Sequence, residues 1–442
     1  MRFKTPQTAS YTWQTILACI WVAFVSAADL KLSVHFIHWY FTAVVLMLLS
    51  TGILRARYSA PVKFTMLGGG LLVLSIAIVA PTTSDLVYQL EEAAKLGIML
   101  LVVAPVLLAR ADTSRGLRLG AEFALAVNGA LVIAGALGVG GILDLRAAGR
   151  YGTFLNGPGS LWRVGIMVLV PSALNLLLGR SFFWPLAMFT GSVAVLVFDG
   201  SRTAGLAILA AVGFVIYFIM KEMRRSRFAS RRLLWRVASL GIVLLAGVAW
   251  RPVQEAYVQN VSFGERLSSI FDAAESNGVA GVEAEDRVRV DMLDESVAAI
   301  VEHPLIGTGM GTTAIVTVAG PMVVHNAYLQ AWADIGILGV ASLVFLTIGI
   351  LLGPWARLSR VALPDVGDRI SFYNGVYLLT CWAFSGLLHP LSTEISEWVM
   401  FIVGLAGLQV AFFRPSRPAQ PAVRFSASDG SRLEMQPASL RP

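Results

Sequence analysis

The chain has few charged residues and almost no cysteine. Charged side chains make up 14% of its 442 residues, whereas hydrophobic side chains make up 56%. A soluble protein of this length needs a larger charged surface, so the composition excludes that class. Cys19 and Cys381 both fall in long apolar runs, and the sequence therefore contains neither a disulfide framework nor a Cys/His metal spacing. The first apolar run has no recognisable cleavage site, so we expect a membrane span there rather than a signal peptide.

Apolar runs long enough to cross about 30 Å of hydrocarbon recur along the whole chain. They predict an all-α polytopic membrane protein with about twelve transmembrane helices. Because some runs are short, a ten-span arrangement remains the alternative. The predicted spans are residues 13–28, 34–53, 62–80, 95–109, 119–143, 161–178, 182–198, 203–220, 233–250, 326–353, 370–388 and 396–413.

These spans divide the chain into four parts. Residues 1–250 form the N-terminal membrane helices, residues 251–324 a large loop, and residues 325–413 the C-terminal membrane helices. The tail at residues 414–442 is rich in Pro, Ser and Ala, a composition typical of disordered segments. We expect the large loop to contain amphipathic helices.

Basic residues divide unequally between the two sides of this arrangement. With both chain ends in the cytoplasm, most of the 34 Lys and Arg residues fall on cytoplasmic segments, and most acidic residues fall on the other side. This is the positive-inside rule, and it places the large loop on the non-cytoplasmic side. The net charge of +7 is explained by anionic membrane lipids and gives no reason to expect a nucleic-acid partner. The basic residues predicted on the loop side are Lys31, Lys95, Arg146, Arg150, Arg163, Arg202, Arg251, Arg266, Arg287 and Arg289.

A surface ion pair or a snorkelling side chain explains many isolated basic residues of this kind. Arg202 is a different case, because it lies in FDGSRTAG, a tight turn between two apolar spans at Phe198–Gly205. An arginine at such a membrane corner is costly unless an anionic group meets it. The neighbouring Asp199 is one candidate partner, and an anionic substrate is the other.

The large loop has an internal pattern. From about Val282 to Val301, apolar residues recur at helical spacing, and they predict an amphipathic helix on the membrane surface. These residues are Val290, Leu293, Val297 and Ile300. Arg287 fits a solvated helix start, whereas Arg289 shares a face with Leu293 and is expected to point inward.

Two polar motifs follow that helix. In HPLIGTGMGT, from His303 to Thr312, Gly307 and Gly309 permit a tight turn or a close approach to a ligand. Farther on, His325 begins an apolar span together with Asn326 and Tyr328. A histidine at a span end is commonly an interfacial anchor, but here it lies in a polar cluster on the side to which several arginines point. We therefore favour a catalytic role for His325.

The combined motifs resemble the O-antigen ligase and O-antigen polymerase superfamily. The matching elements are Arg289–Leu293, Pro304–Gly309, His325–Leu329, Asp334–Gly339, Ser201–Ala204, and RYGTFLNGPGSL at Arg150–Leu161. The last element departs from the common pattern, because Gly157-Pro158-Gly159 replaces a Pro-Asn pair. The resemblance covers roughly residues 150–339.

The resemblance implies a glycosyltransferase in the bacterial inner membrane whose active site faces the periplasm. The donor is a glycan linked to undecaprenyl pyrophosphate. The acceptor is the lipid A-core oligosaccharide in the ligase branch and another lipid-linked repeat in the polymerase branch. We favour the ligase, and a protein-directed oligosaccharyltransferase is a third alternative. The resemblance implies neither a metal nor another cofactor, and Asp272 with the loop acids is the only metal candidate that the sequence offers.

The same resemblance implies roles for individual residues. His325 is expected to act as the general base on the acceptor hydroxyl, because imidazole accepts protons near neutral pH. Arg202 and Arg289 are expected to hold the pyrophosphate, since a guanidinium binds phosphate oxygens bidentately. The further residues expected to contact or orient the substrates are Arg150, Arg163, Arg287, Lys95, Asn326, Tyr328, Gly307 and Gly309.

A transporter or lipid flippase is the alternative from another functional class. Twelve spans is also a common transporter count, and Asn128 and Asn175 are intramembrane polar residues that suit a transport pathway. Against this interpretation, the two halves of the sequence show no inverted repeat. A single large outer loop is also not something that alternating access requires.

Overall fold

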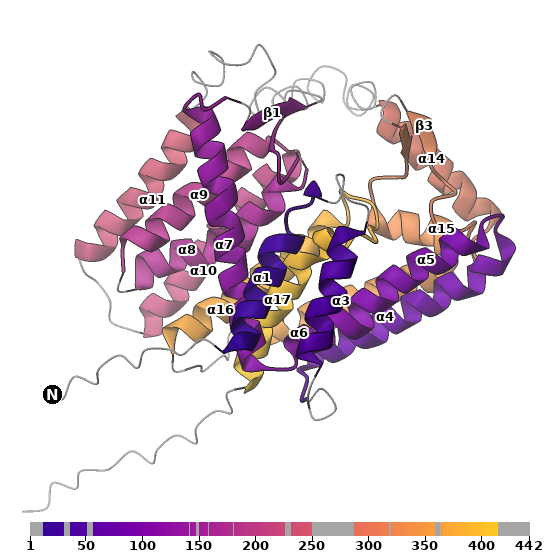
Figure 1. Ribbon diagram of the computed structural model, residues 1–442, viewed down its shortest axis with the longest axis horizontal. Helices are drawn as coiled ribbons and strands as arrows, with labels where there is room; N and C mark the ends of the chain where they lie inside the picture. Colours follow the sequence, from indigo (N-terminus) through magenta and orange to yellow (C-terminus); the bar gives the residue numbers. More distant parts are fainter. Residues whose placement is uncertain are drawn as a thin grey trace, which may run out of the picture.

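The computed structural model describes residues 12–30, 36–50, 56–140, 142–146, 150–157, 159–179, 181–225, 231–249, 287–317, 320–358, 363 and 365–413. Most of the predicted large loop and the whole predicted tail lie outside these residues. The described chain is a helical bundle (Figure 1). Its helices are α1 (Trp13–Val25), α3 (Ile37–Leu49), α4 (Ala60–Val79), α5 (Leu86–Gly97), α6 (Ala104–Leu108), α7 (Ala111–Ala136), α8 (Leu161–Leu178), α9 (Phe183–Asp199), α10 (Arg202–Arg225), α11 (Arg231–Ala249), α14 (Arg287–Glu302), α15 (Ala327–Leu358), α16 (Val366–Ser385) and α17 (Ile395–Phe413).

Two short helical turns complete the helical part. The 3-10 turn η2 (Ala80–Thr82) ends α4, and the π-helical turn η3 (Ile98–Val103) joins α5 to α6. Pro105 follows this wide turn and has no N–H to donate, so the change of helical hydrogen-bonding pattern falls beside a proline.

Five helices within the described residues are long and apolar enough to cross a membrane. They are Ala60–Thr82, Ala111–Ala136, Leu161–Leu178, Thr203–Arg224 and Ala327–Leu358. Five shorter apolar helices accompany them, at Trp13–Val25, Ile37–Leu49, Phe183–Asp199, Trp235–Ala246 and Ile395–Val410. The protein is therefore a helical, multi-pass membrane protein, and the count of twelve spans stays a prediction.

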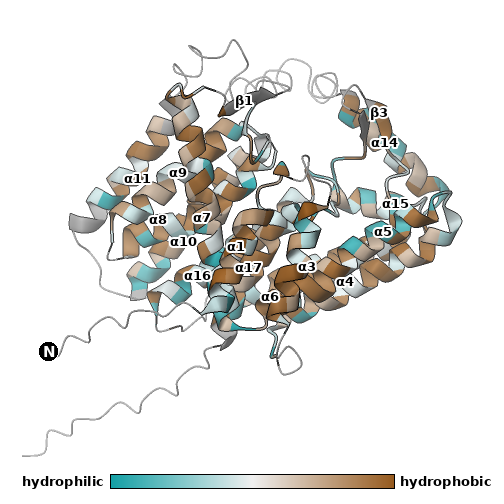
Figure 2. Cartoon of the chain, viewed as in Figure 1, coloured by the Kyte–Doolittle hydropathy of each residue, from teal (hydrophilic) through white to brown (hydrophobic). Residues whose placement is uncertain are grey.

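Helix α8 lies at the centre of one part of the bundle. Its apolar residues are buried on all sides, as expected of a helix surrounded by other helices. The adjoining core contains large aromatic side chains, among them Phe218 stacked on Tyr373 with ring centroids 4.1 Å apart. Other apolar side chains are exposed, for example Met47 (76%) and Leu352 (70%). Figure 2 shows hydrophobic residues along α3 and α4, and the exposed apolar side chains of these two helices are ones that a bilayer would contact.

Two small β-hairpins interrupt the helical pattern. Strands β1 (Leu143–Arg146) and β2 (Arg150–Thr153) pair antiparallel, as do β3 (Ile315–Thr317) and β4 (Gly320–Met322). Both hairpins lie at the same end of the molecule, which we call the hairpin end (Figure 1). The sequence does not predict these hairpins, because strands of three or four residues leave too short an alternating pattern.

Helix α14 confirms the helix predicted within the large loop, but its buried face differs from the predicted one. Met292 and Ser296 are fully buried and Ala299 is 9% exposed, whereas Leu293 is 40% exposed. The small side chains of Ser296 and Ala299 allow α14 to pack closely, and bulky apolar residues alone did not reveal this. Arg289 is exposed, so the expectation that its side chain points inward is wrong. It lies in the first turn of α14, three residues before Met292.

Helix α15 reverses direction sharply near its start. Gly336 has φ 77° and ψ −169°, a backbone conformation that interrupts the helix. The hydroxyl of Tyr328 lies 3.0 Å from that of Thr347, although 19 residues separate the two. A straight α-helix would separate these residues by about 28 Å. The first part of α15 therefore folds back beside the second part.

Candidate functional site

The candidate site is built where several segments meet at the hairpin end. The first is the glycine loop, residues 304–313, which follows α14. The second is the start of α15 with His325, the third is the loop at residues 386–394 between α16 and α17, and the fourth is the adjoining starts of α8 and α10. Hydrogen bonds join each of these segments to at least one other.

The glycine loop packs backbone to backbone against the reversal in α15. Gly307 and Gly309 have φ angles of +81° and +107°, which favour glycine. The amide of Thr308 donates to the carbonyl of Ala333 at 3.1 Å, and that of Gly309 donates to the carbonyl of Asp334 at 2.7 Å. These are carbonyls for which the reversal removes the usual helical partners. The loop therefore satisfies the backbone groups that the reversal leaves open.

The carboxylate of Asp334 fixes the far end of the glycine loop. Its side chain is fully buried. One carboxylate oxygen accepts hydrogen bonds from the Gly311 amide at 2.9 Å and from the Gln330 side chain at 3.1 Å. The other oxygen accepts from the Thr313 hydroxyl at 2.8 Å. Asp334 thus orients the loop.

His325 lies directly before the first turn of α15 and is half-buried. Asn326 caps this helix, because its side-chain oxygen accepts from the amides of Tyr328 and Leu329 at 3.0 and 3.1 Å. The next amide, that of Ala327, donates to the carbonyl of Gly386 at 2.7 Å. The segment that carries His325 is therefore held against the loop between α16 and α17.

The corner between α9 and α10 is also tightly organised. Asp199 is fully buried, and one of its oxygens accepts from the amides of Gly159 and Trp162 at 2.9 and 3.1 Å. The other oxygen accepts from the amide of Ser201 at 3.1 Å. Asp199 therefore stabilises the N-terminus of α8 as well as the corner itself. Arg202 begins α10 at this point.

For three predicted arginines the structure describes the backbone but not the side chain. Arg150 begins β2, Arg202 begins α10 and Arg287 begins α14. The first two positions belong to the hairpin end on the α8 side, and the third lies at the start of the helix that leads to the glycine loop.

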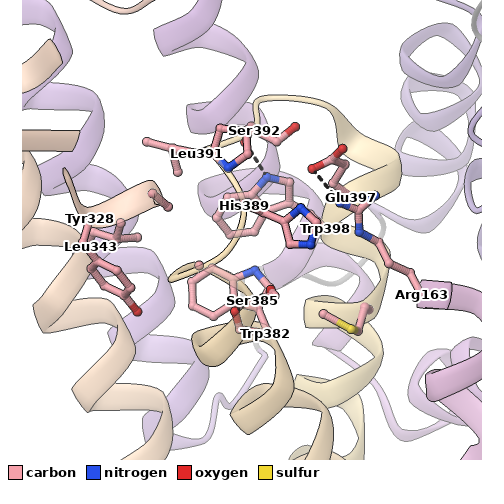
Figure 3. Close-up of a pocket in the computed structure, with 14 residues that line it drawn as sticks. Arg163, Tyr328, Leu343, Trp382, Ser385, His389, Leu391, Ser392, Glu397 and Trp398 are labelled. Carbon is pink, nitrogen blue, oxygen red and sulfur yellow. Dashed lines mark hydrogen bonds and ion pairs between the residues drawn. The ribbon is translucent and has the colours of Figure 1, made fainter. Parts of the chain in front are cut away.

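A pocket opens between α8, α15, α16 and α17, and Figure 3 shows its lining. Arg163 pairs with Glu397, with Nη2 and Oε2 3.1 Å apart, on one side of the pocket. Tyr328 lies on the other side, and His389 lies between them (Figure 3). The Nε2 atom of His389 is 3.0 Å from the hydroxyl of Thr203, the residue that follows Arg202.

Lys95 contributes on a neighbouring helix without lining this pocket. Its ammonium group lies 2.7 Å from Glu91 and 2.8 Å from Glu92, both on the same helix, α5. Glu92 also accepts a hydrogen bond from the hydroxyl of Thr393 in the loop between α16 and α17. Lys95 is thus part of an ion-pair cluster that supports this loop.

The structure brings only part of the predicted set together. Arg163 and Tyr328 line the same pocket. Hydrogen bonds link the segments of Arg202 and His325 to the loop at residues 386–394, part of which lines this pocket. Gly307 and Gly309 shape the packing of the glycine loop and are not among the residues that line the pocket. Arg289 lies on α14.

His389 and Glu397 were missed by the sequence analysis. His389 is one of five histidines in the chain and, like His325, lies at the loop-side end of an apolar span. The criterion that selected His325 therefore applies to His389 as well. Glu397 gives no comparable signal, because a carboxylate in the first turn of a helix is common.

Within the residues that the structure describes, no group of three or more His, Cys, Asp and Glu side chains is arranged to hold a metal ion. Asp272, the metal candidate from the sequence, lies outside the described residues.

Residues 186–344 match the family model described as O-antigen ligase. No curated protein matches the chain. The matched residues include Arg202, Arg289 and His325, together with both loop glycines, and exclude Arg163, His389 and Glu397. The resemblance of this chain to the O-antigen ligase superfamily is therefore confirmed over residues 186–344, without distinction between the ligase and polymerase branches.

Proposed function

We propose that this protein transfers a glycan from undecaprenyl pyrophosphate to the lipid A-core oligosaccharide at the periplasmic face of the bacterial inner membrane. The hairpin end is the periplasmic end in this proposal. His325 is the general base, and Arg202 and Arg289 bind the diphosphate. The family match over residues 186–344 supports an O-antigen ligase or polymerase type of activity.

One observation supports this assignment above the others. The loop at residues 386–394 connects the segment of the proposed base to the segment of a proposed diphosphate ligand. The carbonyl of Gly386, in this loop, accepts a hydrogen bond from the amide of Ala327, two residues after His325. In the same loop, His389 contacts Thr203, next to Arg202. A transfer reaction needs a base and a leaving-group ligand held at a fixed separation, and a shared loop provides this.

The proposed chemistry balances without a metal. The acceptor hydroxyl loses its proton to the imidazole of His325 as its oxygen attacks the anomeric carbon of the donor glycan. The bond between that carbon and the phosphate oxygen breaks, and undecaprenyl pyrophosphate leaves with the electron pair. Negative charge grows on the leaving oxygen during this step. Guanidinium groups stabilise such charge, and they are more effective where water is excluded.

Asn128, one of the two residues that suggested the transporter alternative, gives it no support. Asn128 is buried, and its side chain bonds to the Ala124 carbonyl at 2.9 Å and to Asn156 at 3.0 Å. Asn156 in turn accepts from the amide of Ala28 at 3.0 Å. Asn128 therefore belongs to a network that fastens α7 to the end of α1 and to the segment after β2.

The decisive experiment is transfer by the purified full-length protein in nanodiscs. The donor is undecaprenyl pyrophosphate carrying O-antigen, and the acceptor is lipid A-core. A ligase forms lipopolysaccharide only when the acceptor is present. A polymerase lengthens the lipid-linked glycan without the acceptor, and that product would overturn the ligase assignment. His325→Gln should abolish transfer, whereas wild-type turnover by this variant would reduce His325 to an interfacial anchor.

A further inference from the structure

The proposed catalytic residues are not among the described residues that line the pocket in Figure 3, and one half of this pocket is polar. Its polar lining comes from Arg163 on α8, Glu397 on α17, and His389 and Ser392 in the loop between α16 and α17. All four residues lie outside the matched segment 186–344. The cavity volume of the pocket is about 50 Å³, below the range of enclosed small-ligand sites, so a ligand would lie largely in its open mouth.

The polar groups of this half are rigidly held. The guanidinium of Arg163 lies 5.4 Å from the centre of the Trp162 ring and pairs with Glu397. The ring of His389 stacks on the same Trp162, with centroids 5.8 Å apart and an interplanar angle of 16°. One buried tryptophan therefore holds both the guanidinium and the imidazole. Groups fixed in this way lose little side-chain entropy when a ligand binds.

The charges favour a neutral ligand over a phosphate. Among the described residues that line the pocket, Arg163 is the only guanidinium, and the carboxylate of Glu397 already pairs with it. Glu397 is 34% exposed, so its carboxylate is accessible from the pocket. A carboxylate accepts hydrogen bonds from hydroxyl groups and repels phosphate oxygens.

Aromatic and apolar side chains complete the lining. Trp382 and Trp398 pack with ring centroids 5.4 Å apart, and both line the pocket together with Tyr328 and Leu343. Figure 3 shows these rings around the same space as His389 and Glu397. A ligand with hydroxyl groups around its edge and C–H groups on its faces matches this combination, since apolar faces pack on rings while hydroxyls bond to the carboxylate. A hexose ring has this pattern.

The position of the pocket identifies which sugar would occupy it. Ala327, two residues from His325, lines one side, and His389, which contacts Thr203 next to Arg202, lines another. A hexose here would lie between the proposed base and the proposed ligand of the leaving group. We propose that this pocket binds the acceptor hexose and presents its hydroxyl to His325, with Glu397 and His389 as its specificity-determining residues. This inference rests on the proposed function.

A labelling experiment tests binding without transfer. Ser392→Cys is made in the full-length protein with Cys19→Ser and Cys381→Ala, which removes both native cysteines. Maleimide labelling is measured in nanodiscs with lipid A-core, with lipid A that lacks core sugars, or with undecaprenyl pyrophosphate. We expect protection by lipid A-core alone. Ser181→Cys, at the exposed opposite end of α9, should label equally in every condition.

Every other outcome of the labelling overturns the inference. Protection by undecaprenyl pyrophosphate would make the pocket a lipid-diphosphate site. Equal protection by both forms of lipid A would mean that acyl chains rather than sugars occupy it. Absence of protection by all three would leave the pocket without a saccharide role. If lipid A-core protects the thiol of the Ser392→Cys variant but wild-type protein transfers no glycan, the proposed function fails and the saccharide site stands.

A kinetic comparison tests specificity. Glu397→Gln keeps the shape of the side chain but removes the charge that accepts sugar hydroxyls. We expect the KM for lipid A-core to rise about tenfold, with the KM for the lipid-linked donor unchanged. A purely structural role of the ion pair with Arg163 would instead change both KM values or lower kcat. An increase in the donor KM alone would assign the pocket to the donor sugar and overturn the inference.

Discussion

Replacing Gly336 by alanine should disrupt the candidate site more severely than any other single methyl group added to α15. Gly336 has φ 77° and ψ −169°, a region open essentially to glycine only. Imposing this conformation on alanine costs about 1–3 kcal/mol. A Cβ atom at this position would also lie 2.6 Å from the carbonyl carbon of Ile306 and closer still to the carbonyl oxygen of Leu305. Both are backbone atoms, which cannot rotate away.

The steric term adds to the conformational one. Overpacking in a well-packed interior costs about 1–3 kcal/mol, so the total is about 2–6 kcal/mol. The glycine loop can relieve the clash only by moving away from α15, which would break the bonds from Thr308 and Gly309 to Ala333 and Asp334. The side chain of Gln330 donates to Asp334 and accepts from the amide of Leu391. The loop at residues 386–394 would therefore shift as well.

The assay combines thermal unfolding with glycan transfer, both in nanodiscs. Gly336→Ala should unfold at a lower temperature than wild type, and its transfer rate should fall at least tenfold even where the protein is still folded. Gly353→Ala is the matched control, because Gly353 lies in the same helix and a Cβ there would meet no atom within 4 Å. That variant should be neutral or up to about 1 kcal/mol more stable. Wild-type stability and transfer in Gly336→Ala would refute the account of the reversal.

Four further perturbations separate the roles assigned to individual groups. Arg202→Ala should remove most transfer in the nanodisc assay, and Arg202→Lys should restore only part of it, because a point charge replaces a bidentate fork; full activity of Arg202→Ala would remove it from the diphosphate site. Wild-type transfer should decrease as the pH is lowered, because a protonated imidazole can no longer act as a base. Incubation with EDTA should leave transfer unchanged, whereas loss restored by magnesium would reveal a missed metal site. Asp199→Asn should cost about 1–3 kcal/mol in thermal unfolding, since its amide group would face backbone N–H donors of Gly159, Trp162 or Ser201; an unchanged unfolding temperature would contradict the capping role.

The helices were predictable because apolarity is a local property of the sequence. Their ends were less so. Helix α7 begins at Ala111, whereas the apolar run predicted a span from residue 119. Its first turns contain Asp112, Arg115 and Arg118, which are compatible with a helix but not with a purely apolar window. Membrane helices can therefore extend beyond the hydrophobic stretch that reveals them.

The packed face of α14 shows a different limit. The sequence predicted burial of Leu293 and Val297 from their size and apolarity, yet the structure buries Met292 and Ser296. A face is selected by how closely two helices can approach, and a serine favours close approach when its hydroxyl bonds within its own helix. The Ser296 hydroxyl does so, donating to the Met292 carbonyl at 2.9 Å. Such pairings depend on the partner surface, which one segment of sequence does not contain.

The candidate site shows the same contrast between local and long-range information. His325, Gly307 and Gly309 were predicted as site residues because each belongs to a short motif, and none of the three is among the described residues that line the pocket. His389 and Glu397 gain meaning only from contacts with residues far away in the chain, such as Thr203 and Arg163, which lie 186 and more than 200 positions before them. No short sequence pattern predicts a contact between residues that lie so far apart in the chain.

This division bears on the difference between a ligase and a polymerase. Both reactions use a glycan on a polyprenyl diphosphate, so they need the same groups for the leaving diphosphate and for proton removal. In the proposed mechanism these are Arg202, Arg289 and His325, and all three lie within the matched segment 186–344. The two reactions differ in the acceptor. If the pocket beside Arg163 and Glu397 binds the acceptor hexose, residues outside that segment decide whether the protein acts as a ligase or a polymerase. The family model does not cover those residues. Replacing the sequence of the loop between α16 and α17 should then change which acceptor the protein uses, while the protein still consumes the lipid-linked donor.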